Sequence, residues 1–174
     1  MSIYLYNKTS QEISKRIALN YSTSFSLGIK LLGKEFRGPI FSIYGMVRVA
    51  DEIVDTFHNF DQRRMIDEFE QETYRSIEEG ISTNPILHAF QEVANQYGIG
   101  KNLIGPFFSS MKEDLEKDSH DSSSYQEYIY GSAEVVGLMC LKVFCKGDDD
   151  LYKKLEPGAK ALGSAFQKVN FLRD

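Results

Sequence analysis

The sequence predicts an all-α protein that forms a single helical bundle. Apolar residues recur with helical spacing along most of the 174 residues, whereas the alternating pattern of a β-strand is nearly absent. Hydrophobic residues make up 42% of the chain and charged residues 26%, a balance that supports a sizeable core and excludes wholesale disorder. No repeat, low-complexity segment or linker-like stretch divides the sequence. We therefore expect one domain.

Capping residues, glycines and prolines predict where the helices begin and end. Thr9 to Glu12 and Ser124 to Glu127 both match the capping box, in which side chains satisfy the first free N–H groups of a helix. Proline is well suited to the first helical turn, and glycine to the residue after the last turn. On these signals the predicted helices cover about residues 9–19, 22–32, 38–57, 61–80, 84–98, 105–117, 124–144 and 157–174.

Charge and cysteine content narrow the class of protein. The net charge is −5, which disfavours a generally basic nucleic-acid binder. Cys140 and Cys145 cannot build a disulfide framework; they fit a reducing compartment and are most simply packing residues of an apolar helix. The N-terminus lacks the basic and apolar regions of a secretory signal, and the longest apolar stretch, 135–145, is too short to span a bilayer. We expect a cytoplasmic protein.

The most informative segment is the apolar helix around Arg48, Asp51 and Asp55. Acids four residues apart on a helix lie roughly 6 Å apart along its axis and face the same way, and Arg48 lies one turn earlier on that face. Acids in an apolar helix incur a desolvation cost that a cation can offset. Mg²⁺ is commonly held by one or two carboxylates together with phosphate oxygens and water. The alternative is that Asp51, Glu52 and Asp55 form the solvated stripe of an amphipathic helix.

A second stripe of oxygen ligands follows on the last predicted helix. Gln167, Asn170 and Asp174 are spaced so that all three share one side of that helix, and Arg173 flanks them. Two apolar helices that each carry such a stripe predict a site between helices of the bundle.

Four segments together resemble the squalene/phytoene synthase family, in order and in approximate spacing. They are residues 21–26 (YSTSFS), Arg48 with 51–55 (DEIVD), 128–137 (YIYGSAEVVG) and 162–174 (LGSAFQKVNFLRD). The resemblance implies an all-α fold of the isoprenoid-synthase type and a Mg²⁺-dependent prenyltransferase, with Mn²⁺ as a substitute. Such enzymes join two prenyl diphosphates head-to-head with loss of diphosphate.

The resemblance also implies a role for each matching residue. Asp51 and Asp55 would hold Mg²⁺ on a substrate diphosphate, and Asn170 and Asp174 would belong to the second metal motif. Tyr130 would line the reacting centre. The residues expected to contact diphosphate are Ser22, Ser24, Arg48, Gln167 and Arg173.

Two departures from the family pattern stand out. Glu134 and Ile129 occupy positions where the family usually has a small residue. The family's second motif also continues to another acid beyond Asp174, and its members are longer. We therefore expect residues 1–174 to be the N-terminal part of one prenyl synthase domain, without the final helices and inactive by itself.

The sequence leaves the product open between related choices. The segment 132–137 (SAEVVG) favours phytoene, made from two geranylgeranyl diphosphates in carotenoid biosynthesis. The alternative is a squalene or dehydrosqualene synthase that uses farnesyl diphosphate; only squalene would require NADPH, and no glycine-rich dinucleotide fingerprint is found. A long hydrocarbon product is compatible with peripheral contact with a membrane.

Two other classes of protein compete less well. A di-iron oxidase bundle requires two Glu-x-x-His motifs, and the sequence contains none. A non-catalytic helical scaffold predicts that Asp51→Asn leaves function unchanged and that diphosphate does not bind.

Overall fold

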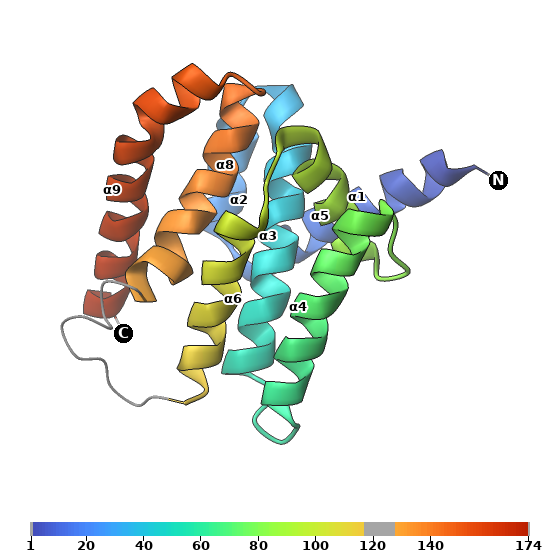
Figure 1. Cartoon of the computed structure of the whole chain (residues 1–174), viewed down its shortest axis with the longest axis vertical. Helices are drawn as coiled ribbons and strands as arrows, with labels where there is room; N and C mark the ends of the chain where they lie inside the picture. Colours follow the sequence, from blue (N-terminus) through green and yellow to red (C-terminus); the bar gives the residue numbers. More distant parts are fainter. Residues whose placement is uncertain (1, 117–127, 174) are drawn as a thin grey trace.

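The computed structural model describes residues 2–116 and 128–173, with side chains described as far as Gln167. All regular structure in this part of the chain is helical (Figure 1), which confirms the predicted fold class. The elements are α1 (Ile3–Tyr21), α2 (Thr23–Leu31), α3 (Lys34–Asp55), α4 (Gln62–Glu79), α5 (Pro85–Tyr97), α6 (Lys101–Asp114), the short π-helix η1 (Tyr130–Glu134), α8 (Val135–Cys145) and α9 (Asp149–Arg173).

Helices α2, α4 and α5 begin at side-chain caps, close to the predicted starts at residues 22, 61 and 84. Ser22 Oγ accepts a hydrogen bond from the Phe25 N–H at 3.2 Å, and Asp61 accepts from the Arg64 N–H at 3.1 Å. Asn84 Oδ1 accepts from two N–H groups at the start of α5. Gly80 and Gly98 end α4 and α5 with φ angles of 70° and 68°, in the left-handed region that glycine tolerates.

Four predicted helix starts are wrong, among them the start at residue 105, because α6 begins at Lys101 and Pro106 lies inside it. Helix α1 begins at Ile3, and Thr9 lies inside it, its hydroxyl donating to the Leu5 carbonyl at 2.8 Å. Helices α3 and α9 begin well before Pro39 and Pro157, which both lie inside them. Tertiary packing and earlier caps, such as Asp148 Oδ1 accepting from the Leu151 N–H, carry these helices through a residue that lacks a donor. The predicted loop at 118–123 and capping box at 124–127 lie outside the described residues.

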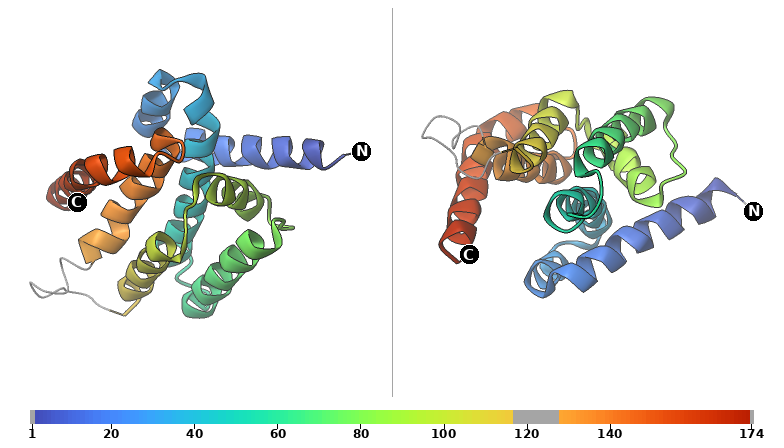
Figure 2. Two further views of the ribbon diagram at one scale, coloured as in Figure 1. Left: turned by 45° about the horizontal axis from the view of Figure 1, so that its top comes forward. Right: turned by 90° about the horizontal axis from the view of Figure 1, so that it is seen from below.

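Helix α3 is the centre of the bundle. It contacts α1, α2, α4, α5, α6 and α8, and its buried side chains join one continuous hydrophobic core. The first half of α1 projects beyond the other helices, while α9 covers α8 and η1 on the far side (Figure 2). The largest fully buried side chains of this core include Phe90, Phe107, Phe108, Ile43, Met46, Ile66, Leu87, Ile104, Leu138 and Met139.

Helix α8 forms one side of this core. Cys145 is buried and Cys140 is half-buried with a pKa raised to about 12 by loss of hydration, so the expectation of packing cysteines is confirmed. None of the described helices combines the length and the apolar character needed to cross a membrane.

The π-helix η1 is fixed by close contacts on two sides. A Cβ added at Gly131 would lie 2.4 Å from the Pro106 carbonyl oxygen and 2.9 Å from the Ser110 Cβ. On the other side, a Cβ at Gly163 of α9 would lie 2.9 Å from the Ala133 carbonyl oxygen. Two glycines therefore set the position of η1 between α6 and α9.

We expect Gly131→Ala to lower the free energy of unfolding by about 1–3 kcal/mol, because the added methyl group overpacks a rigid backbone contact. The matched control is Gly28→Ala on α2, where an added Cβ meets nothing within 4 Å. Removing a glycine from an exposed helical position stabilises by up to about 1 kcal/mol. Urea unfolding curves measure both variants, and equal midpoints would contradict the close packing of η1 on α6.

Candidate functional site

The predicted acidic motif lies at the C-terminal end of α3 and is not a fully solvated stripe. The side chains of Asp51 and Glu52 are 29% and 16% exposed, while Asp55, the last residue of α3, is exposed. Neighbouring Ile53 and Val54 are buried in the core. The helix therefore presents Asp51 at the edge of the core, where its charge is poorly hydrated.

Arg48 is held in place by three neighbours. One guanidinium nitrogen hydrogen-bonds to Glu52 Oε1 and another lies 3.9 Å from Asp51 Oδ2. The guanidinium carbon lies 4.6 Å from the centre of the Tyr21 ring, a cation–π contact. The side-chain hydrogen bond to Glu52 and the charges of both acids keep the pKa of Arg48 above its ordinary value against its burial. Arg48 is thus a fixed positive charge beside the acids.

Ser22 and Tyr44 connect this charged group to α2. Besides capping α2, Ser22 shares a hydrogen bond with the hydroxyl of Tyr44, and the Tyr44 ring stacks on Phe25 with centroids 4.9 Å apart. Burial raises the pKa of Tyr44, which also lies close enough to Arg48 and Asp51 to feel their charges. The structure therefore brings Ser22, Arg48 and Asp51 together, whereas Ser24 lies exposed on α2.

The acids of α3 lie close to other negatively charged side chains. Loss of hydration, together with the charges of Asp55, Asp114 and Glu52, raises the pKa of Asp51 to about 7 against the lowering effect of Arg48. The pKa of Asp55 is also raised, first by loss of hydration and then by Glu52. One arginine does not offset this concentration of carboxylates.

Sequence reasoning missed the parts played by Asp114 and Tyr128. Asp114 is the last residue of α6, and the Tyr128 hydroxyl donates to it. Burial first, and then the charges of Asp114, Asp55 and Asp51, raise the pKa of Tyr128. In the sequence Asp114 belongs to a polar run that looks like a solvated helix end, and no spacing rule links it to α3.

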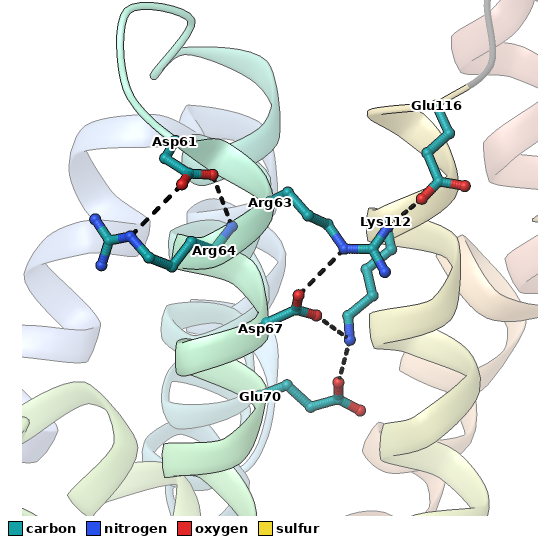
Figure 3. A network of polar contacts seen from close by, with 7 residues as sticks. All are labelled: Asp61, Arg63, Arg64, Asp67, Glu70, Lys112 and Glu116. Atoms are coloured by element: carbon teal, nitrogen blue, oxygen red, sulfur yellow. Dashed lines mark hydrogen bonds and ion pairs between the residues drawn. The ribbon is translucent and has the colours of Figure 1, made fainter.

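A polar network fixes α6 against α4 (Figure 3). Lys112 Nζ lies 2.5 Å from Asp67 Oδ1 and 2.6 Å from Glu70 Oε2. Arg63 bonds to Asp67 at 3.2 Å and also contacts Glu116. Lys112 of α6 and Arg63 of α4 are both paired with acids between these two helices, so they do not neutralise the acids of α3.

The donor set fits Mg²⁺. Among the described residues, no group of three or more His, Cys, Asp or Glu side chains is placed to hold a metal by itself. Mg²⁺ needs no such group, because one or two carboxylates, phosphate oxygens and water complete its octahedron. Asp51 and Asp55 supply hard oxygen donors whose raised pKa values reflect poor hydration and neighbouring acids, a state that a bound cation relieves.

Tyr130 lies within the described residues, whereas the second motif does so only in part. Tyr130 is half-buried at the start of η1, and π-helices of this kind occur often at functional sites. Lys160 Nζ lies 5.6 Å from the Tyr130 ring centre and 2.7 Å from Glu156. Gln167 is half-buried on α9, while the side chains of Asn170, Arg173 and Asp174 lie outside the described residues.

Comparison with known proteins gives a family match over nearly the whole chain. Residues 18–174 match the family described as squalene/phytoene synthase. The chain is 26% identical over 164 residues to a 4,4'-diapophytoene synthase of Staphylococcus haemolyticus, covering 91% of this chain and 55% of that protein. It is 28% identical over 178 residues to a phytoene synthase of Arthrospira platensis, covering 95% of this chain and 57% of that protein.

Solved structures show the same fold. A dehydrosqualene synthase crystal structure superposes with a TM-score of 0.83 at 22% identity, covering 99% of this chain and 59% of that one. A squalene synthase from Alicyclobacillus acidocaldarius gives the same TM-score and identity, covering 98% of this chain and 62% of that one. The chain thus spans little more than half the length of the two relatives named above.

We expect Asp51→Asn to stabilise the metal-free protein at alkaline pH. The folded-state pKa of Asp51 is about 7, above its ordinary value of 3.8, so the folded state binds this proton more tightly than the unfolded state. The group therefore makes stability fall as pH rises from about 4 to about 7. Removing it should raise the free energy of unfolding at pH 8 by roughly 1–4 kcal/mol, with little change at pH 4.

Urea unfolding in EDTA at both pH values measures this effect. Glu79→Gln, which removes an exposed acid at the end of α4, is the charge-matched control. A variant less stable than wild type at pH 8 would contradict the poorly hydrated, repelled state of Asp51.

Proposed function

We propose that this chain, a member of the squalene/phytoene synthase family, binds prenyl diphosphates and serves in their head-to-head coupling. The observation that carries the proposal is the group formed by Arg48, Asp51 and Asp55 at the end of α3. The group lies within the residues that match the family model. In it, a fixed guanidinium lies beside two carboxylates that lack sufficient counter-charge. Such a combination suits a ligand that is itself a metal-bound anion.

The residues around Arg48 suit a departing diphosphate. Ionisation of an allylic diphosphate places negative charge on the leaving group, and preorganised positive groups stabilise that charge. Arg48 needs little reorganisation, because Glu52 and Tyr21 already hold it. Mg²⁺ held by Asp51 and Asp55 would supply further charge neutralisation. Ser22, at the start of α2, lies on the same side and offers a hydroxyl to phosphate oxygens.

The helix that includes η1 and α8 suits the hydrocarbon part of the substrate. A carbocation survives only where water is excluded, so the reacting chains require an apolar wall. Gly131, Leu138 and Leu141 are buried along this helix, and Gly137 packs close to the Ala159 carbonyl of α9. Tyr130 can offer its π face and hydroxyl near the cation.

For the product we propose phytoene, formed from two geranylgeranyl diphosphates. The relatives include both a 4,4'-diapophytoene synthase and phytoene synthases, one of them from Zea mays, and these names support head-to-head coupling in carotenoid formation. Dehydrosqualene from farnesyl diphosphate is the competing product. Incubation of the full-length protein with each diphosphate, with and without NADPH, followed by hydrocarbon analysis distinguishes them. A C30 product alone would contradict the phytoene assignment, and NADPH-dependent squalene would assign a squalene synthase.

We expect pyrophosphate binding to require both a divalent cation and the acid pair of α3. Calorimetry with pyrophosphate should show binding in Mg²⁺ and little in EDTA. Asp51→Asn and Asp55→Asn keep the side-chain shape but each removes a charged ligand, so affinity in Mg²⁺ should fall by at least about tenfold. Unchanged affinity in both variants, with Glu79→Gln as the control, would refute the metal-site assignment.

We expect Tyr130→Phe to reduce turnover far more than substrate affinity. The hydroxyl is lost while the ring stays, so no cavity opens and stability should change by less than about 1 kcal/mol. Hydrocarbon formation and thermal unfolding are measured on the same preparation of the full-length protein. Wild-type turnover in the variant would make Tyr130 a packing residue of η1.

A further inference from the structure

We propose that Lys160 of α9 is a positioning residue for Tyr130: its ammonium, paired with Glu156, lies over the tyrosine ring and keeps that ring in one orientation. The inference rests on the proposed function, in which Tyr130 lines the reacting centre, and adds to it a residue from a different helix. Lys160 acts here only through Tyr130 and does not itself touch the substrate.

The first support is the contact between the ammonium and the ring. Lys160 Nζ lies 5.6 Å from the centre of the Tyr130 ring, within the roughly 6 Å over which an aromatic face attracts a cation. Both side chains are half-buried, so solvent screens this attraction only in part. The contact opposes rotation of the ring away from the cation, and it thereby restricts where the tyrosine hydroxyl points.

The second support is that Lys160 has little freedom of its own. Its ammonium lies 2.7 Å from Glu156 Oε1, one turn earlier on α9. The charge of Glu134 on η1 also acts on Lys160, so carboxylates of both helices attract the same ammonium. A freely moving lysine could not orient a ring, whereas one attracted from two helices can.

The third support is the close crossing of α9 on the helix that carries Tyr130 (Figure 1). A Cβ added at Gly163 would lie 2.9 Å from the Ala133 carbonyl oxygen. A Cβ added at Gly137 would lie 3.4 Å from the Ala159 carbonyl oxygen. Position 163 thus faces 133 and position 159 faces 137, so the two helices run antiparallel in a fixed register. Lys160 lies between these two contacts, which fixes its backbone beside η1.

The fourth support is the balance of charge around the ring. A lysine alone beside a reacting carbocation would oppose its formation, since like charges repel. Glu156 and Glu134 each bring a negative charge to Lys160, so this group of side chains is not a net positive charge beside the ring. Glu134 is the acid that departs from the family pattern. The inference gives this residue a role, because it offsets the cation that holds Tyr130.

The alternative is that Lys160 only fastens α9 to the bundle. The interface of α8 and α9 contains a second contact of this kind, in which Lys142 Nζ of α8 lies 4.1 Å from the centre of the Tyr152 ring of α9. This second contact also joins the two helices, and Tyr130 is not part of it. Lys142 is therefore a matched control that shares the fastening role and lacks the positioning role.

The decisive variant is Lys160→Met in the full-length protein, because it keeps the length of the side chain and removes the charge. We expect turnover in hydrocarbon formation to fall roughly three- to tenfold, as for the loss of one cation–π contact, while KM stays nearly unchanged. Lys160→Arg restores a cation and should recover most of the turnover. Lys142→Met should lower the urea unfolding midpoint at least as much as Lys160→Met does, yet leave turnover like wild type.

A second measurement tests whether Lys160 acts through Tyr130. In the Tyr130→Phe background, which we expect to be slow already, adding Lys160→Met should cause little further loss, because the hydroxyl that the lysine positions is gone. Losses that multiply would give Lys160 a separate role and overturn the inference. Wild-type turnover in Lys160→Met, or an equal loss of turnover in Lys142→Met, would also overturn it.

The outcomes separate this inference from the proposed function. If Lys160→Met retains turnover while Tyr130→Phe loses it, the inference fails and the proposed function stands. If Tyr130→Phe has wild-type turnover, no catalytic hydroxyl is left to position, and the inference fails while the coupling reaction stands. If the wild-type full-length protein forms no hydrocarbon from either prenyl diphosphate, the proposed function fails as well.

Discussion

The burial of helix α3 is the constraint on which the rest of the structure depends. Six other helices pack on it, so its middle is core, and its charged residues lie toward its two ends. Asp51 is thereby held where hydration is poor, and its pKa rises to about 7. A carboxylate in that position destabilises the metal-free fold, and under the proposed function the same placement would attract a bound cation.

Contacts among the remaining helices fix the orientation and position of the helices around α3. The charged network between α4 and α6 fixes the rotation of α6, and with it the side on which Asp114 lies. Surface ion pairs individually contribute little to stability, but a network can set orientation at small energetic cost. Close contacts at Gly131 and Gly163 place η1 between α6 and α9, so that Tyr130 has one position relative to the bundle.

The acid at position 134 illustrates how a change in one helix is accommodated by another. Glu134 stands in η1, and its charge acts on Lys160 of α9. Lys160 also pairs with Glu156 and lies over the ring of Tyr130. The counter-charge comes from a helix that packs directly on η1.

The sequence by itself determined the features that depend on residues close together along the chain. Helical periodicity gave the all-α class, and the caps at Asp61 and Asn84 fixed α4 and α5, because a cap satisfies N–H groups only two or three residues away. The same short-range geometry placed Arg48, Asp51 and Asp55 on one face.

Only the tertiary structure decided the early starts of α3 and α9, where packing carries a helix through proline. It alone decided that Asp51 is half-buried and that Asp114 and Tyr128 stand beside it. Hydration and charge at a carboxylate are set by whatever side chains surround it in space, and residues from α3, α6 and the start of η1 meet only when the bundle closes.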